Sequence, residues 1–174
     1  MKLRFLALLL GAVLLTGCWG PVNGISVSSN VGNELTQEQR FTLKNLKDEA
    51  VSLDQVLAQN KAVLIDFWAT WCGYCVEAMP DLIKLHNQKK DRGFTILAVN
   101  VGESKEQATL FAEKMNIPFP IVLDEDSAVA ERYGVVGIPF SLLIDPRGRL
   151  LGEYHAYSRQ LESDVEKALA ESPA

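Results

Sequence analysis

Residues 62–75 have the sequence Ala62-Val63-Leu64-Ile65-Asp66-Phe67-Trp68-Ala69-Thr70-Trp71-Cys72-Gly73-Tyr74-Cys75. The apolar run from Ala62 to Ala69 has the length and composition of a buried strand, and the two cysteines follow where a helix is expected to begin. Two cysteines three residues apart on the first turn of a helix can close a small disulfide ring and reopen it. These residues therefore predict redox chemistry at the junction of a strand and a helix.

Other uses of a C-x-x-C pair are disfavoured by the surrounding residues. A structural zinc site needs four ligands, and besides the pair the chain offers only Cys18, His86 and His155, none at ligand spacing. A c-type haem attachment needs histidine directly after the second cysteine, where this chain has Val76. A purely structural disulfide more usually joins distant segments, because closing so short a loop removes little chain entropy from the unfolded state. We therefore expect a redox pair with no metal and no cofactor.

The N-terminus resembles a bacterial lipoprotein leader. Lys2 and Arg4 form a positive region before the apolar stretch from Phe5 to Leu15, which is too short to span a bilayer comfortably. The sequence Leu15-Thr16-Gly17-Cys18 resembles the lipobox, in which cleavage before the cysteine leaves a lipid-bearing N-terminal residue. Residues 1–17 are thus predicted to be a signal peptide and Cys18 a lipid anchor. The alternative is an ordinary secretory signal with an incidental cysteine.

Composition divides the rest of the chain into a tether and one domain. Residues 18–34 are rich in Gly, Asn, Ser and Val with few bulky side chains, which indicates a flexible tether. Residues 35–174 have the length of a single domain. The formal net charge is −5, and loss of a leader containing two basic residues would make it more negative. An acidic chain of this kind argues against nucleic acid as a partner.

Within the domain, apolar runs of strand length alternate with segments of helical period, which is typical of an α/β fold. The capping-box pattern that begins at Ser104 and the sequence Asp145-Pro146-Arg147-Gly148 predict a helix start and a hairpin turn. Strands are predicted at 41–46, 49–51, 61–69, 94–101, 121–123, 140–144 and 150–154, and helices at 52–58, 72–90, 104–115, 126–134 and from 158 onward. The expected N-caps of the second-last and last helices are Asp126 or Ser127 and Ser158, Ser52 is expected to cap the first helix, and Gly134 is expected as a left-handed C-cap.

Several motifs together resemble the thioredoxin fold. They are residues 67–75, Pro80 within the following helix, and Gly137-Ile138-Pro139. Residues 99–104 and 143–148 resemble more narrowly the membrane-anchored TlpA and ResA proteins, over nearly all of residues 35–170. The resemblance implies a central mixed sheet flanked by helices, with an added helix and strand between Ser104 and Leu123.

The two cysteines are expected to have different roles. Cys72 lies at the helix N-terminus, where free N–H groups and the helix dipole favour a thiolate, so it is predicted to attack. Cys75, one turn further on, is predicted to resolve the mixed disulfide. The resemblance implies a cis peptide bond before Pro139, which would leave the backbone of Ile138 free to pair with a substrate. Trp71 and Tyr74 are expected to rim this site.

Proton transfer is predicted to depend on Asp66. It lies six residues before Cys72, where thioredoxins have a buried carboxylate, and burial raises the pKa of such a group toward neutrality. The alternative is a buried aspartate that merely satisfies local donors. The TlpA and ResA group commonly has a glutamate three residues after the second cysteine, where this chain has Ala78. Glu77 is adjacent, but one residue turns a helical side chain by about 100°, so we expect it to face solvent.

The predicted function is that of a thiol:disulfide oxidoreductase tethered outside the cytoplasm in a bacterial cell envelope, where disulfides persist. The resemblance implies that it reduces specific exported proteins, such as apocytochrome c or a copper-site assembly factor, and that a membrane thiol reductant supplies electrons. A thiol peroxidase of the same fold is the alternative. Such enzymes usually lack a second cysteine three residues after the first. A non-catalytic binding module is a third possibility, against which the two intact cysteines argue.

Overall fold

The computed structural model describes residues 31–171, so the predicted signal peptide and Cys18 lie outside the described residues. The helices and strands follow one another along the chain as η2 (Gln37–Gln39), β1 (Thr42–Asn45), β2 (Ala50–Ser52), α1 (Leu53–Gln59), β3 (Ala62–Trp68), α2 (Gly73–Lys89), η3 (Lys90–Arg92), β4 (Phe94–Val101), α3 (Lys105–Met115), β5 (Ile121–Asp124), α4 (Ala128–Arg132), β6 (Phe140–Ile144), β7 (Leu150–Tyr154) and α5 (Arg159–Glu171). The predicted alternation of strands and helices is confirmed.

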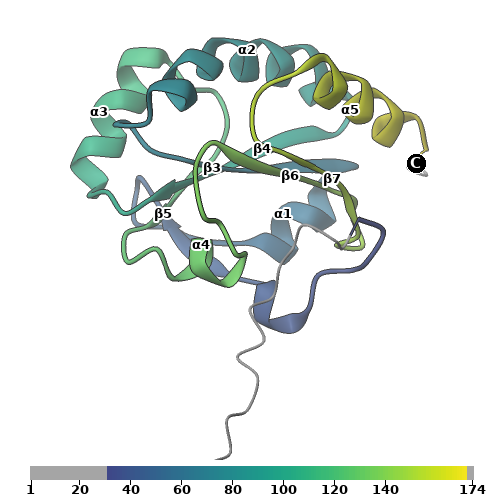
Figure 1. Cartoon of the computed structure of the whole chain (residues 1–174), viewed down its shortest axis with the longest axis horizontal. Helices are drawn as coiled ribbons and strands as arrows, with labels where there is room; N and C mark the ends of the chain where they lie inside the picture. The colour runs from purple at the N-terminus through teal and green to yellow at the C-terminus, as the bar shows by residue number, and fades with distance from the viewer. Residues whose placement is uncertain (1–30, 172–174) are drawn as a thin grey trace, which may run out of the picture.

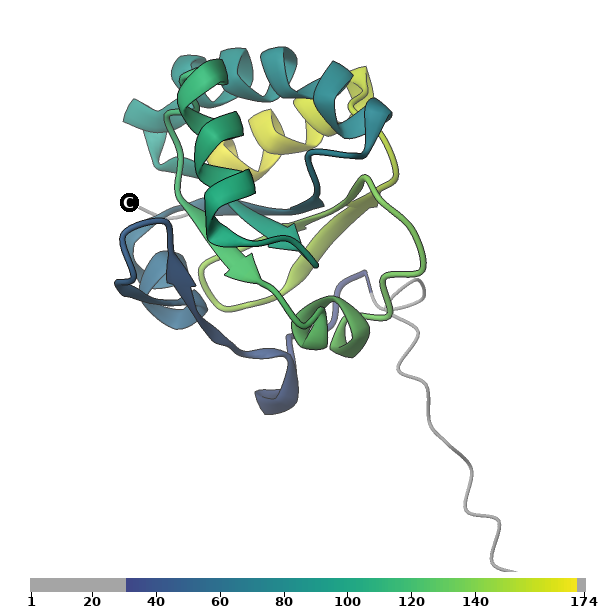
Figure 2. The same ribbon diagram turned by 90° about the vertical axis from the view of Figure 1, so that its left-hand side faces the viewer.

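A single mixed sheet forms the centre of the fold (Figure 1). Its strand order is β2-β1-β5-β4-β3-β6-β7, in which β3, β4 and β5 are parallel and the other pairs are antiparallel. Helices α2, α3 and α5 cover one face, and α1 and α4 cover the other (Figures 1 and 2). This is the thioredoxin fold that the sequence predicts.

Strand β3 is buried on both faces and joins the two halves of the core. Its even-numbered apolar residues, such as Leu64 and Trp68, pack in the cluster that includes α2 and α5. Ile65 and Phe67 point the other way and pack in the cluster that includes α1 and α4. Because successive side chains of a strand alternate between faces, Asp66 lies on the α2 side. The strand that carries Asp66 is therefore the most enclosed part of the sheet.

The predicted helix-strand insertion is present as α3 and β5. Ser104 caps α3 as expected, since its hydroxyl accepts from the backbone N–H of Gln107 at 3.4 Å, while its own N–H donates to the Gln107 side chain at 3.2 Å. Strand β5 pairs in parallel with β4 and antiparallel with β1. The insertion thus connects the N-terminal hairpin to the central strands.

Two aspartates cap helix α4, and the sequence predicts one of them. Of the expected caps Asp126 and Ser127, the Asp126 carboxylate accepts from the N–H of Ala128, the first residue of α4, at 3.1 Å, whereas the Ser127 side chain makes no capping hydrogen bond. The buried carboxylate of Asp124 accepts from the N–H groups of Val129 at 3.0 Å and Ala130 at 2.8 Å. Ser52, the predicted cap of α1, also makes no side-chain capping bond. The Asp124 carboxylate, at the end of β5, thus accepts from two free N–H groups of α4. A pattern that considers only the residues next to the helix start does not predict these bonds.

The described residues before position 35 pair with the β6–β7 hairpin. Gly32 donates to the carbonyl of Leu150 at 2.8 Å, and the N–H of Leu150 donates to the carbonyl of Asn33 at 2.9 Å. Glu34 forms an isolated antiparallel bridge with Arg149. Residues 32–34, which composition assigned to the tether, therefore lie against the domain.

Candidate redox site

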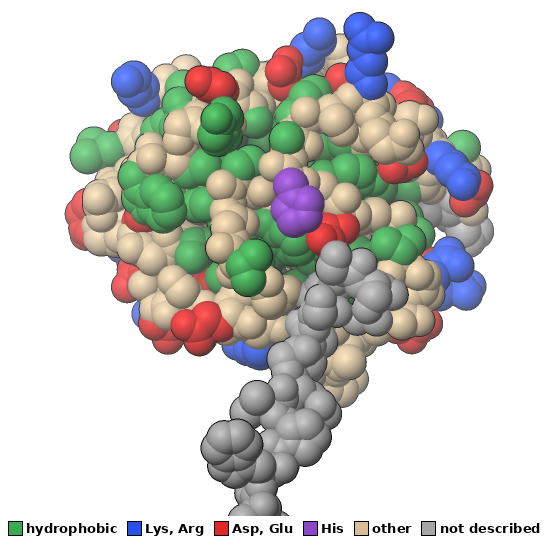
Figure 3. Space-filling model, in the orientation of Figure 1, with side chains coloured by type: hydrophobic (Ala, Val, Ile, Leu, Met, Phe, Trp, Pro, Cys, Tyr) green, Lys and Arg blue, Asp and Glu red, His purple; other side chains and the backbone are tan. Residues whose placement is uncertain are grey.

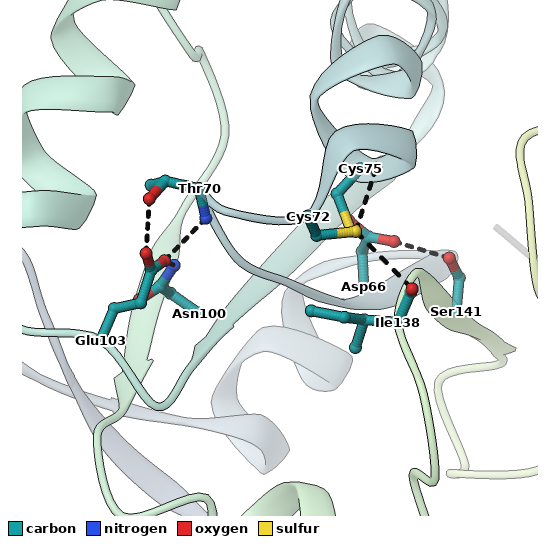
Figure 4. Close-up of a disulfide and its surroundings, with 8 residues drawn as sticks. All are labelled: Asp66, Thr70, Cys72, Cys75, Asn100, Glu103, Ile138 and Ser141. Carbon is teal, nitrogen blue, oxygen red and sulfur yellow. Dashed lines mark hydrogen bonds between the residues drawn. A yellow bond between two sulfur atoms is a disulfide. The ribbon is translucent and has the colours of Figure 1, made fainter.

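Cys72 and Cys75 form a disulfide where β3 leads into α2 (Figure 4). Their Cα atoms are 5.2 Å apart, and both side chains are buried. Helix α2 begins at Gly73, so Cys72 is its N-cap, and the Cys72 Sγ accepts from the backbone N–H of Cys75 at 3.2 Å. A hydrogen bond to a sulfur atom at a helix N-terminus stabilises negative charge on that sulfur when it is a thiolate. The geometry is that of a dithiol whose first sulfur is the better nucleophile.

The loop between α4 and β6 brings a proline against the disulfide. The peptide bond between Ile138 and Pro139 is cis, as the resemblance implied. The carbonyl oxygen of Ile138 lies 3.6 Å from the Sγ of Cys72 (Figure 4). The backbone at Ile138 therefore lies directly beside the Cys72 sulfur, at the N-terminus of α2.

Asp66 is buried on β3, and only 3% of it is exposed. Its carboxylate accepts a hydrogen bond from the Ser141 hydroxyl of β6 at 2.6 Å (Figure 4). Burial raises the pKa of Asp66 to about 6, and the Ser141 hydrogen bond opposes that rise. The loss of water around the ionised carboxylate outweighs the one hydrogen bond from Ser141 that favours it. A carboxyl group with this pKa can accept or release a proton near neutral pH.

The tryptophans and tyrosine around the motif differ in exposure. Trp71 is 69% exposed and Tyr74 76% exposed, as expected of residues at the rim of a site. Trp68 is fully buried, where its ring packs against Phe111 with centroids 5.2 Å apart. In the orientation of Figure 1, hydrophobic side chains gather across the middle of the face that the α4–β6 loop crosses, while most Lys and Arg side chains lie at its edges (Figure 3). This face thus has an apolar centre, with most of its positive charge at the periphery.

A second carboxylate near the motif was missed from the sequence. Glu103, in the loop after β4, is only 4% exposed. It accepts from the backbone N–H of Thr70 at 2.7 Å, from the Thr70 hydroxyl, and from the Asn100 amide at 2.7 Å (Figure 4). The signal available in the sequence was the polar Asn100 at the end of an otherwise apolar strand. This network ties the corner before Cys72 to the neighbouring strand.

The carboxylates that follow the second cysteine on α2, Glu77 and Asp81, are exposed. For Glu77 this is as predicted. Ala78 lines a groove together with Ile138 and Pro139, so a methyl group lies at the position where the resemblance implied a glutamate. Asp66 is therefore the buried acid on the α2 side of β3.

Residues 31–171 contain no cluster of three or more His, Cys, Asp or Glu side chains arranged to hold a metal ion. Within the same residues, none of the helices has both the length and the apolar character needed to cross a membrane. His86, to which no role was assigned, is buried against Phe119 with ring centroids 5.4 Å apart.

The sheet order, the cysteine pair at the start of α2 and the cis proline opposite it define a thioredoxin-fold protein with a dithiol–disulfide site. The model of the AhpC/TSA family matches residues 35–155. The chain belongs to the AhpC/TSA family and, by its relatives, to the thioredoxin-like thiol-disulfide oxidoreductases of the ResA type.

Three comparisons describe this relationship. The thiol-disulfide oxidoreductase ResA of Halalkalibacterium halodurans is 32% identical over 115 residues, which cover 66% of this chain and 64% of that protein. The ResA of Bacillus subtilis is 31% identical over 129 residues, which cover 74% and 71% of the two chains. The crystal structure of the thioredoxin domain of a thiol-disulfide oxidoreductase from Bacteroides vulgatus superposes with a TM-score of 0.70 at 32% identity, covering 80% of this chain and 97% of that one. The chain thus spans less than two thirds of the H. halodurans relative.

Proposed function

We propose that this protein is an extracytoplasmic, membrane-tethered thiol:disulfide oxidoreductase that reduces disulfides of specific exported proteins. The observation that carries the proposal is the position of Cys72 as N-cap of α2, with its sulfur hydrogen-bonded at 3.2 Å by the Cys75 N–H. This favours a thiolate on Cys72 and places the second sulfur within bonding reach.

The reaction proceeds by two exchanges. The Cys72 thiolate attacks one sulfur of a partner disulfide, and the other partner sulfur leaves as a thiolate. Cys75 then attacks Cys72, which forms the Cys72–Cys75 disulfide and releases the reduced partner. Each exchange forms one S–S bond and breaks one, and the pair of electrons passes from the protein to its partner.

Asp66 handles the proton of the second cysteine. Cys75 must lose a proton before it attacks, and Asp66, whose pKa is raised by burial to about 6, is the buried base on the same side of β3. The backbone of Ile138 and the cis Pro139 present an edge to an extended partner segment, and Trp71 and Tyr74 rim it. Together these residues form the proposed catalytic and substrate-binding site.

Location and partners are part of the same proposal. Residues 1–17 act as a lipoprotein signal, Cys18 carries the lipid, and the following residues tether a domain that extends to residue 174. The protein then faces exported substrates, and the process proposed for it is cytochrome c maturation. A membrane thiol reductant restores the dithiol.

Reduction of insulin by dithiothreitol, measured as turbidity with and without the full chain, tests the activity. We expect clear acceleration by the wild type and none by Cys72→Ser. Equal rates for the two would contradict the proposal.

A thiol peroxidase is the second candidate, because the matching family model is that of AhpC/TSA. The disulfide between Cys72 and Cys75, which are three residues apart in sequence, favours the oxidoreductase, because thiol peroxidases of this fold usually lack the second cysteine. Peroxide consumption assayed beside insulin reduction separates the two: the peroxidase predicts rapid loss of peroxide and little insulin reduction.

A further inference from the structure

A groove opens beside the disulfide and extends along the exposed face of α2. It has a volume of about 520 Å³ and is lined by Tyr74, Glu77 and Asp81 of α2, by Ile138 and Pro139, and by Tyr157 of the β7–α5 loop. Because the Ile138 carbonyl is 3.6 Å from the Cys72 sulfur, the groove begins at the redox site. A partner segment whose cysteine reacts at Cys72 has this groove as its path.

The far end of the groove is negatively charged. The Tyr157 hydroxyl donates to Glu162 of α5 at 2.6 Å. Burial raises the pKa of Tyr157, and the hydrogen bond to Glu162 and the charges of Glu162 and Asp81 raise it further. Asp81 and Glu162 therefore act on the same hydroxyl from opposite elements, α2 and α5. Glu77 adds a third carboxylate, one helical turn nearer to the cysteines.

Positive charge does not balance these acids. None of the described residues that line the groove is lysine or arginine. His155 lines it as well, but its imidazole lies 3.1 Å from the carboxylate of Glu153 on β7. One oxygen of that carboxylate is buried without a hydrogen-bond partner. The groove thus combines two tyrosine rings and several carboxylates, which is a surface suited to a cationic side chain.

The spacing along α2 gives the position of that cation. Glu77 and Asp81 lie five and nine residues after Cys72. The midpoint between the two carboxylates is therefore about 10 Å from the reacting cysteine along the helix axis. An extended chain advances about 3.3 Å per residue, so this distance corresponds to about three residues.

We propose that the groove binds an extended segment of the partner protein that carries lysine or arginine about three residues from the reacting cysteine. The inference rests on the proposed oxidoreductase function and specifies its substrate class. Carboxylates at a solvent-exposed rim act mainly on the rate of encounter and are screened by salt. The preference for a basic partner is therefore largest at low ionic strength.

The test uses synthetic peptides with a single cysteine joined in a disulfide to 5-thio-2-nitrobenzoate. The pre-reduced full chain with Cys75→Ser is mixed with each peptide. The Cys72 thiolate bonds to the peptide sulfur, the peptide's S–S bond breaks, and the coloured nitrothiobenzoate anion leaves with the electron pair. Peptides differ only in having lysine, glutamine or glutamate three residues before or after the cysteine.

At low salt we expect the lysine peptide to react roughly three- to tenfold faster than the glutamate peptide on one side of the cysteine. The ratio should fall toward one at high salt. Glu77→Gln with Asp81→Asn should remove most of the preference. The matched control is Asp91→Asn, the same loss of charge on an exposed residue beyond the far end of α2, and it should keep the preference.

Equal rates for the three peptides would overturn the inference while leaving the oxidoreductase function intact. An equal preference in the Glu77→Gln, Asp81→Asn variant would also overturn it, because the acids would then not be its source. Failure of every peptide to release nitrothiobenzoate would instead count against Cys72 as the attacking thiol, and thus against the proposed function.

Discussion

The Glu103 carboxylate accepts the backbone N–H of Thr70 at 2.7 Å, across 33 residues of sequence. Thr70 lies two residues before Cys72, at the corner where β3 gives way to α2. The same carboxylate receives the Thr70 hydroxyl and the Asn100 amide. A single buried side chain therefore accepts three hydrogen bonds at this corner and holds it against the end of β4.

We expect Glu103→Gln to lower the free energy of unfolding by about 1–3 kcal/mol. An amide keeps only one acceptor oxygen, so the Thr70 hydroxyl loses a carboxylate oxygen to donate to, and the remaining hydrogen bonds lose the strength that the negative charge gives them. Urea unfolding of the oxidised protein measures this. Glu113→Gln, on the exposed face of α3, should change the value by less than about 0.5 kcal/mol. Similar losses in both variants would show that the network contributes nothing of its own.

Asp66→Asn should stabilise the oxidised protein in a pH-dependent way. The folded-state pKa of about 6 lies above the usual value near 4, so the folded protein favours the protonated carboxyl. Below about pH 4 the group is protonated in both states and costs nothing, whereas above pH 6 it must ionise in the folded state and lowers stability. We expect the variant to be more stable by about 2–3 kcal/mol at pH 8 and unchanged at pH 4, as measured by urea unfolding. A gain that did not vary with pH would contradict the assignment.

The same variant should be a slower catalyst. Without a base of suitable pKa, only solvent is left to take the proton from Cys75. The rate of insulin reduction should therefore decrease, and its pH profile should move to higher pH. Rates measured from pH 5 to pH 9 for the wild type and Asp66→Asn check this. An unchanged profile would make Asp66 a structural residue only.

Cys75→Ser should trap partner proteins as mixed disulfides with Cys72, because the resolving step is lost while the attack remains. Non-reducing electrophoresis after incubation of the reduced variant with exported proteins should show bands that disappear with dithiothreitol. Cys72→Ser should give far fewer. If neither variant yields such bands, or both yield the same ones, the roles of the two cysteines are wrong.

Asp124→Asn should lower stability by about 1–2 kcal/mol. The Asp124 carboxylate accepts from both Val129 and Ala130, and an amide would turn a donor toward one of these N–H groups. Asp126→Asn is the matched control, because the single bond that Asp126 accepts from Ala128 at 3.1 Å needs only one oxygen. Thermal unfolding of both variants compares them, and equal shifts would contradict the cap.

Metabolic labelling with a radioactive fatty acid tests the lipid anchor. We expect the wild-type chain to be labelled in a bacterial host and Cys18→Ser to remain unlabelled. Label on the substituted chain would disprove the lipoprotein proposal without affecting the redox site.

Much of the fold follows from local pattern. The seven strands and the main helices lie within a few residues of their predicted positions. This is because a buried strand and an amphipathic helix each require a characteristic spacing of apolar residues along the sequence. The Ser104 cap of α3 and the left-handed Gly134 after α4 follow from near neighbours in the chain. The predictions of Ser52 and Ser127 as caps were wrong, because neither side chain makes a capping hydrogen bond.

The redox pair could be found from residues 62–75 alone, because two cysteines at the start of a helix are chemically distinctive wherever the rest of the chain lies. Glu103, the Asp124 cap and the acidic groove could not be found in that way. The Glu103–Thr70 contact and the groove depend on segments that approach one another only when the sheet is assembled. The Asp124 cap depends on a carboxylate at the end of β5 whose partners are N–H groups five and six residues further on. Burial then determines their properties: it raises the pKa of Asp66, and it leaves the enclosed Glu103 carboxylate to accept hydrogen bonds from Thr70 and Asn100.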